Sequence, residues 1–128
     1  ADVLPQGKHW IVWDKINTMP TFGDCELLWT NIKRNSVKKI LFQWNGLLGK
    51  EKERNHATQK PTSLIQRILQ NYSQPGMTIF DPFAGSGTTA IACLETGRNY
   101  ILIEKEPDYI EIINKRIAQW KEQGRMFA

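Results

Sequence analysis

In the N-terminal third of the chain, the apolar residues stand in short runs that are typical of β-strands. Residues 8–15 and 25–30 each combine aromatic and aliphatic side chains, and the proline and glycine between them favour a loop. These two strands can therefore form an antiparallel pair. Residues 36–44 mix lysines with apolar side chains and fit either an edge strand or an irregular arm, whereas residues 45–55 favour a loop. We interpret the tryptophans of this part as core residues rather than as platforms for stacked bases: Trp10, Trp13 and Trp29.

In the rest of the chain, helical and strand patterns alternate. The runs 77–80 and 99–103 are typical of strands, and the segment 89–94 between them is helical and is followed by a glycine that ends it. Pro61 and Pro107 fit the first positions of two further helices. The expected buried faces of those helices are Leu64, Ile65, Ile68 and Leu69 in the first and Tyr109, Ile110, Ile113, Ile117 and Trp120 in the second. This order predicts an α/β fold with a parallel sheet.

A turn rich in glycine joins the first of these strands to the helix that follows it. The turn has the sequence DPFAGSGTT over residues 81–89, where Gly85 and Gly87 let the backbone approach a ligand that a side chain would block. Free N–H groups at a helix start favour a carboxylate or a phosphate. Glu104 ends the next strand, and an acid at that place accepts hydrogen bonds from ribose hydroxyls. Nicotinamide and S-adenosylmethionine sites both fit this pattern, and an ordinary turn without a ligand is the third alternative.

The composition is that of one globular domain. The chain has 128 residues, of which 41% are hydrophobic. No apolar run reaches the roughly 20 residues of a membrane span, and the first residues do not resemble a signal peptide, so we expect a cytoplasmic protein without a membrane partner. Cys25 and Cys93 have no spacing typical of a disulfide or a metal site, and Cys93 is expected in the core.

The net charge of +4 is unevenly distributed. Residues 33–60 contain eight basic and two acidic side chains, which gives this segment +6 and leaves −2 for the rest of the chain. A concentrated basic segment is typical of proteins that bind a polyanion. A solvated, lysine-rich loop explains the charge equally well.

Two motifs together resemble the amino-methylating DNA methyltransferases. They are HATQKP at 56–61 and DPFAGSGTT at 81–89, followed by Ile-Glu and a helix that contains tyrosine. The chain is similar to the permuted, or beta, class of that family, in which the cofactor motif follows the catalytic one, as in phage and restriction-modification enzymes. The resemblance covers about residues 8–120. Ala57 stands where the family usually has proline, which we expect to loosen the turn only a little.

The resemblance implies a partial Rossmann-like methyltransferase sheet with flanking helices, within one incomplete domain that spans residues 1–128. It implies that S-adenosylmethionine is bound by Thr58, Lys60, Thr62, Asp81, Phe83, Ala84, Gly85, Ser86, Gly87, Thr88, Thr89 and Glu104. It makes residues 31–57 a target-recognition segment that lies along DNA phosphates. The basic residues expected there are Lys33, Arg34, Lys38, Lys39, Lys50, Lys52 and Arg54. Residues 13–15 resemble the strand that borders the pocket for the flipped base.

One element of the family is missing from this sequence. The catalytic motif, Asp or Asn followed by Pro-Pro and an aromatic residue, does not occur, and Asp81-Pro82-Phe83 belongs to the cofactor turn. In the permuted class this motif would precede residue 1, on a strand that neighbours the 78–80 strand. The 78–80 strand is apolar and is expected to be covered on both faces, so we expect its uncovered edge to pair with another chain.

The sequence therefore predicts the cofactor-binding half of a DNA methyltransferase that modifies the amino group of adenine or cytosine. Its catalytic motif would come from an upstream segment or a second polypeptide, and self-association is the other expected way of covering the open edge. Direct transfer is expected, because neither cysteine follows a proline as in ring-carbon methyltransferases. The alternatives are an inactive module that binds S-adenosylmethionine or DNA, and a nicotinamide-binding domain, against which the 56–61 motif argues.

Overall fold

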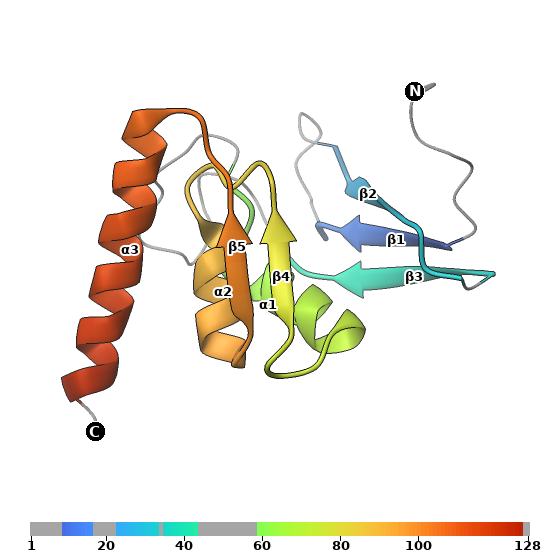
Figure 1. Ribbon diagram of the computed structural model, residues 1–128. Helices are drawn as coiled ribbons and strands as arrows, with labels where there is room; N and C mark the ends of the chain where they lie inside the picture. Colours follow the sequence, from blue (N-terminus) through green and yellow to red (C-terminus); the bar gives the residue numbers. More distant parts are fainter. Residues whose placement is uncertain (1–8, 17–22, 34, 44–58, 127–128) are drawn as a thin grey trace. The chain divides into compact units, whose positions relative to one another are not determined.

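The computed structural model describes residues 9–16, 23–33, 35–43 and 59–126 (Figure 1). The chain separates into two compact units, residues 1–52 and 53–128. That the whole chain forms one methyltransferase domain stays a prediction. Within the described residues, no helix is long and apolar enough to cross a membrane.

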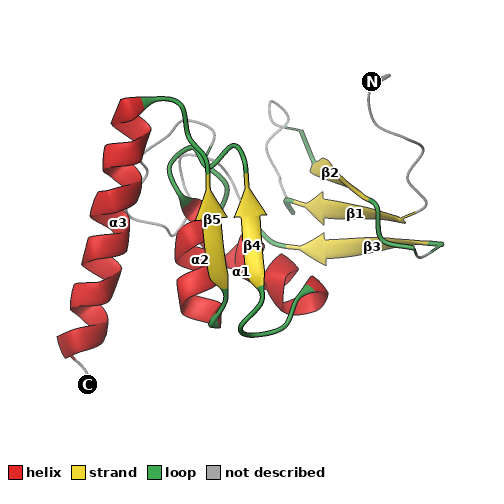
Figure 2. Ribbon diagram, viewed as in Figure 1, coloured by secondary structure: helices red, strands yellow, loops and turns green. Residues whose placement is uncertain are grey.

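The first unit contains a three-stranded sheet with the strand order β2-β1-β3 (Figure 2). Strand β1 (His9–Asp14) pairs antiparallel with β2 (Cys25–Thr30), as predicted, and parallel with β3 (Ser36–Leu41). The mixed segment that begins at Ser36 is therefore an edge strand and not an irregular arm.

The tryptophans of this sheet differ in burial. Trp13 is 1% exposed and donates its indole N–H to the carbonyl oxygen of Phe42 over 2.9 Å, so it is a core residue as predicted. Trp10 and Trp29 are paired across β1 and β2 on the opposite face and are half-buried. His9 shares the face of β1 that bears Trp13 and is fully buried, with its Nδ1 2.6 Å from the Ser36 carbonyl oxygen. One face of this sheet is thus buried much more completely than the other.

The second unit is a βαβ unit with a helix before and after it. Its elements are α1 (Thr62–Tyr72), β4 (Thr78–Asp81), α2 (Thr88–Thr96), β5 (Asn99–Leu102) and α3 (Pro107–Met126). Strands β4 and β5 are parallel, and α2 is the crossover between them (Figure 1). The prediction for Pro61 was wrong by one position: its ψ of 133° is extended, so it is the N-cap and not the first helical residue.

Helices α1 and α2 cover one face of the β4–β5 sheet. Leu69, Ala92 and Cys93 form the buried cluster, against which Ile79 and Tyr100 pack from the strands. Cys93 is 0% exposed, which confirms it as a core residue, and burial raises the pKa of its thiol.

The other face of the β4–β5 sheet is open in the part of the chain that is described. Phe80 is 59% exposed and Ile101, its partner in the register, is 55% exposed. The expectation that the 78–80 strand is covered on both faces was therefore wrong for Phe80. Parallel sheets normally have helices on both faces, whereas here α1 and α2 contribute only to the face that bears Ile79.

Helix α3 buries less of its apolar stripe than its periodicity predicts. Ile113 is 8% exposed, but Ile110 is 41% exposed, so the assignment of Ile110 to the buried face was wrong. The remaining members of the predicted stripe are half-buried: Tyr109, Ile117 and Trp120. Helix α3 therefore makes its closest contact near Ile113.

Arg98 ties the end of α1 to the start of β5. It is 8% exposed and donates from Nη2 to the carbonyl oxygens of Ser73, over 2.9 Å, and Leu69, over 3.4 Å. Its Nη1 donates to the carbonyl oxygen of Thr96. The carbonyl groups of Ser73 and Thr96 lie at the ends of α1 and α2, where helical N–H partners run out, whereas the Leu69 carbonyl also accepts the N–H of Ser73. Arg98 therefore connects the C-terminal ends of both helices to the start of β5.

Candidate functional site

Asp81 stabilises the turn that carries the glycines by accepting two hydrogen bonds. We call residues 82–87 the glycine turn; it leads from β4 into α2. Oδ1 of Asp81 accepts the N–H of Phe83 over 3.0 Å, and Oδ2 accepts the hydroxyl of Thr89 over 2.6 Å. Gly85 and Gly87 have φ angles of +51° and +78°, in the left-handed region that favours glycine. Both oxygens of Asp81 therefore shape the turn itself.

Gly87 is one of the points where α3 lies against the turn. A Cβ atom at Gly87 would lie 2.8 Å from Cγ1 of Ile113 and 3.3 Å from its Cβ. Among the described residues, a Cβ atom at Gly85 would meet nothing within 4 Å. The two glycines therefore have different roles. Gly87 leaves room for the Ile113 side chain of α3, and Gly85 leaves space beside the turn that a ligand can occupy.

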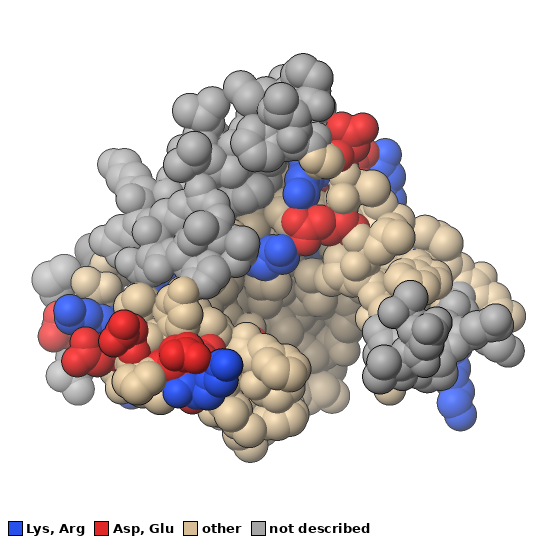
Figure 3. Space-filling model, turned by 90° about the horizontal axis from the view of Figure 1, so that it is seen from above, with Lys and Arg blue, Asp and Glu red and all other residues tan. Residues whose placement is uncertain are grey.

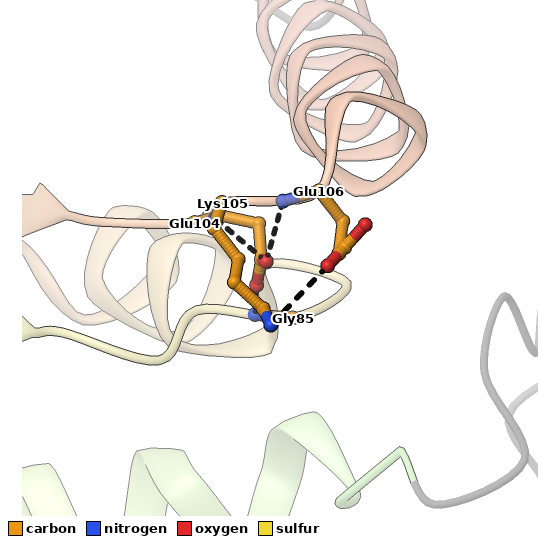
Figure 4. Close-up of polar contacts among 4 residues, drawn as sticks. All are labelled: Gly85, Glu104, Lys105 and Glu106. Carbon is orange, nitrogen blue, oxygen red and sulfur yellow. Dashed lines mark hydrogen bonds and ion pairs between the residues drawn. The ribbon is translucent and has the colours of Figure 1, made fainter.

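Glu104 holds the turn from the end of β5. Its Oε2 accepts the N–H of Gly85 over 2.8 Å, and its Oε1 accepts those of Lys105 and Glu106 over 2.8 and 3.0 Å (Figure 4). These bonds lower the pKa of Glu104, the N–H of Glu106 most, and burial opposes the shift. An ionised carboxylate has about four acceptor positions, so Glu104 can accept about one further hydrogen bond.

A cavity of about 410 Å³ adjoins the turn. Its lining residues are Gln59, Lys60, Ile65, Asp81, Phe83, Ala84, Gly85, Ser86, Thr88 and Thr89. The volume is within the roughly 300–1,000 Å³ that is usual for small-molecule sites. Most of the predicted cofactor-binding residues are thereby brought together. Phe83 stands at its edge and is 88% exposed.

Some predicted residues lie elsewhere. Thr62 is buried at the start of α1, Gly87 faces Ile113, and Thr58 is outside the described residues. Glu104 lines a second cavity, of about 620 Å³, between β5 and α3, together with Ile113 and Lys121. The hydrogen bond between Glu104 and Gly85 thus joins a lining residue of the second cavity to a lining residue of the first.

Sequence reasoning missed two polar residues of the site. Gln59 is 6% exposed, and its Oε1 accepts the hydroxyl of Ser86 over 3.2 Å. Arg116 of α3 donates to the carbonyl oxygen of Ser86 over 2.6 Å. Gln59 lies inside the 56–61 motif, which was a usable signal, but Arg116 is 30 residues from Ser86 and has no local signal.

The basic residues predicted to contact DNA are only partly described. Lys33, Lys38 and Lys39 are exposed in the first unit, and Lys39 forms an ion pair of 2.7 Å with Asp14. The bond to Lys39 is the main reason why the pKa of Asp14 is lowered. Acidic and basic side chains of the described residues lie interspersed in the view of Figure 3. The other predicted basic residues are outside the described part: Arg34, Lys50, Lys52 and Arg54.

Residues 13–15, compared above with the border of a base pocket, interact with one another, with β2 and with β3. Lys15 forms an ion pair of 2.9 Å with Glu26, and its ammonium lies 5.2 Å from the centre of the Trp13 ring. The role of this segment in binding a base stays a prediction.

The sequence and the fold have counterparts in known proteins. The chain belongs to the N6_N4_Mtase family of DNA methylases, which it matches over residues 6–115. It is 34% identical to the type II methyltransferase M.HinfI of Haemophilus influenzae in an alignment 140 positions long, which covers 87% of this chain and 39% of the relative. It is 40% identical to the type II methyltransferase M2.DpnII of Streptococcus pneumoniae in an alignment 86 positions long, which covers 65% of this chain and 32% of the relative.

A solved structure has the same fold. The complex of M1.HpyAVI with S-adenosylmethionine matches with a TM-score of 0.68 and 29% identity, over 84% of this chain and 60% of that chain. The predicted resemblance and the predicted fold class are therefore confirmed. The chain spans about two fifths of M.HinfI and one third of M2.DpnII.

Proposed function

We propose that this chain is the S-adenosylmethionine-binding part of a site-specific DNA methyltransferase that modifies the exocyclic amino group of adenine or cytosine. The observation that carries the proposal is the cavity beside the glycine turn, with Glu104 bonded to Gly85 at its border. The open space around Gly85 fits a ligand that approaches the backbone closely. The complex of M1.HpyAVI with S-adenosylmethionine supports the same ligand.

The residues present match the polar groups of S-adenosylmethionine. Asp81 and Lys60 line the cavity with opposite charges, which suits an amino-acid group that carries both charges. The further acceptor position of Glu104 suits a ribose hydroxyl. When bound, S-adenosylmethionine supplies an activated methyl group on its sulfonium. The amino nitrogen of the base would accept that methyl group and lose a proton.

The groups that hold the target base are proposed to come from outside this sequence, from an upstream segment or from a second polypeptide. A second copy of the chain would cover the open edge of the sheet without supplying the catalytic motif. The exposed apolar face around Phe80 and Ile101 supports an additional covering element. We also propose a cytoplasmic location, where DNA is accessible and the two free cysteines stay reduced.

The absence of the catalytic motif from this sequence is the observation that supports an alternative function. In that alternative, the chain is an inactive module that retains cofactor or DNA binding. Radiolabelled methyl transfer to DNA separates the two functions. Transfer that requires both this chain and a chain with the catalytic motif supports the methyltransferase. Binding without transfer in that mixture supports the inactive module.

We expect S-adenosylhomocysteine, the demethylated product, to stabilise the chain against unfolding. At about 100 times its dissociation constant, the free energy of unfolding should rise by about 2.7 kcal/mol. Thermal melts with increasing ligand measure this effect, and nicotinamide adenine dinucleotide at the same concentrations is the control. A shift with the dinucleotide alone would contradict the proposed cofactor.

We expect DNA binding to be weak and to depend on the lysines of the 31–57 segment. Neutralising Lys38, Lys39, Lys50 and Lys52 should flatten the plot of log affinity against log salt, by up to about 0.9 for each phosphate that the variant no longer neutralises. Fluorescence anisotropy with labelled duplex DNA at several salt concentrations measures the slope. Replacing Lys115, an exposed residue of α3, is the control. An unchanged slope in the quadruple variant would mean that these lysines are only solvated.

A further inference from the structure

A hydrogen-bonded series of three polar residues, Arg116, Ser86 and Gln59, connects α3 with the cavity. Nη1 of Arg116 lies 2.6 Å from the carbonyl oxygen of Ser86 and 3.5 Å from its hydroxyl oxygen. The Ser86 hydroxyl lies 3.2 Å from Oε1 of Gln59. Gln59 and Ser86 are each 6% exposed, and both line the cavity. The hydrogen-bonded series therefore ends at a residue that lines the proposed cofactor site.

The direction of the hydrogen bonds in this series follows from the chemistry of arginine. A guanidinium group only donates, so the Ser86 oxygen accepts from Arg116. The Ser86 hydroxyl donates its single proton to the amide oxygen of Gln59, Oε1. This leaves the Nε2 amino group of Gln59 as its donor end. By occupying one of the two acceptor positions of the Ser86 oxygen, Arg116 favours the arrangement in which the Gln59 amide oxygen accepts.

We propose that Arg116, acting through Ser86, is a positioning residue that fixes Gln59 as a hydrogen-bond donor to the carboxylate of the bound cofactor. Beside Gln59, the cavity is lined by the Lys60 ammonium, also a donor. Gln59 and Lys60 thus both provide hydrogen-bond donors on this side of the cavity. Donors match the carboxylate of the ligand and not its ammonium group. Asp81, an acceptor in the same cavity, matches the ammonium of the amino-acid group. This inference rests on the proposed function, because it assumes that the ligand is S-adenosylmethionine.

The test compares two ligands that share adenosine and a thioether. S-adenosylhomocysteine carries the amino-acid group and 5′-methylthioadenosine lacks it. Isothermal titration of the 128-residue chain gives the ratio of the two affinities. R116M and S86A should each weaken S-adenosylhomocysteine about tenfold and leave 5′-methylthioadenosine nearly unchanged. In a Q59M background, R116M should cause no further change in the ratio, since its effect passes through Gln59.

Arg98 offers a matched control, because it also donates to backbone carbonyls but does not line the cavity. R98M should lower the melting temperature and leave the ratio of affinities unchanged. S86A retains the carbonyl that Arg116 contacts, so it decides the question if R116M does not fold. A ratio that stays constant in R116M or S86A, with binding by the parent chain intact, overturns this inference alone. Failure of the parent chain to bind S-adenosylhomocysteine overturns the proposed function and this inference with it.

Discussion

Replacing Gly87 by alanine should lower the free energy of unfolding by about 2–5 kcal/mol and remove measurable binding of S-adenosylhomocysteine. Two costs combine at this position. A left-handed conformation costs a residue with a Cβ atom about 1–2 kcal/mol. The new methyl group would also lie 2.8 Å from Cγ1 of Ile113, and overpacking of this kind costs about 1–3 kcal/mol. Urea unfolding followed by tryptophan fluorescence measures the sum.

Two glycine variants separate these costs. Gly85→Ala introduces the backbone strain without a close contact, so its stability should fall by only about 1–2 kcal/mol. Gly124→Ala, within α3 and with open space around it, should be neutral or stabilising by up to about 1 kcal/mol. In the double variant G87A/I113A, the decrease in stability should be smaller than the sum of the two single decreases. Equal decreases for Gly87→Ala and Gly85→Ala would show that Ile113 moves aside without cost.

Glu104→Gln should weaken the binding of S-adenosylhomocysteine by about tenfold or more, although the side chain keeps its size. Glutamine has one acceptor oxygen, whereas Glu104 uses two, one for Gly85 and one for the pair Lys105 and Glu106. The amino end of glutamine would therefore face an N–H donor on one side. The turn would lose this tether and keep the hydrogen bond from the Ala84 N–H to the Ile103 carbonyl oxygen. Titration calorimetry at neutral pH measures the effect on affinity.

The acid dependence of binding provides a second measurement on Glu104. Its pKa in the folded chain is lowered from the ordinary value of 4.5, so its ionised form stabilises the turn above that pH. This stabilisation is lost as the pH falls through the lowered pKa. The parent chain should lose affinity in that acid range, and the Glu104→Gln variant should show a smaller acid-dependent loss. Glu106→Gln is the control, because the Glu106 side chain pairs with exposed Lys105 and not with the turn. A glutamine variant with parental affinity and parental pH dependence would contradict the tether.

The parts of the fold that the sequence predicted are those with short-range signals. The strand, the glycine turn and the following helix occupy neighbouring residues, and Gly97 ends α2 in a left-handed conformation, as a helix-ending glycine does. The strand at Ser36–Leu41 remained ambiguous in the sequence, because lysines are typical of both edge strands and loops. Pairing with β1 decides between them, and this pairing depends on residues far away in the chain.

The wrong and missed assignments have a common physical reason. The periodicity of α3 identifies its apolar stripe, but it does not say how much of the stripe a partner covers, so Ile110 was placed in the core. The same holds for Phe80 on the open face of the sheet. Arg98 and Arg116 have arginine's usual surface pattern in the sequence, and only the fold brings backbone carbonyls within their reach.

The candidate site is built from one uninterrupted piece of the polypeptide. Every hydrogen bond described for it joins residues between Gln59 and Arg116, including the tether from Glu104 to Gly85 and the contacts of Ser86. A rearrangement of the gene with breakpoints outside this piece would therefore keep all of these hydrogen bonds within one segment. The order of the remaining segments could then change without separating the partners of any of these bonds.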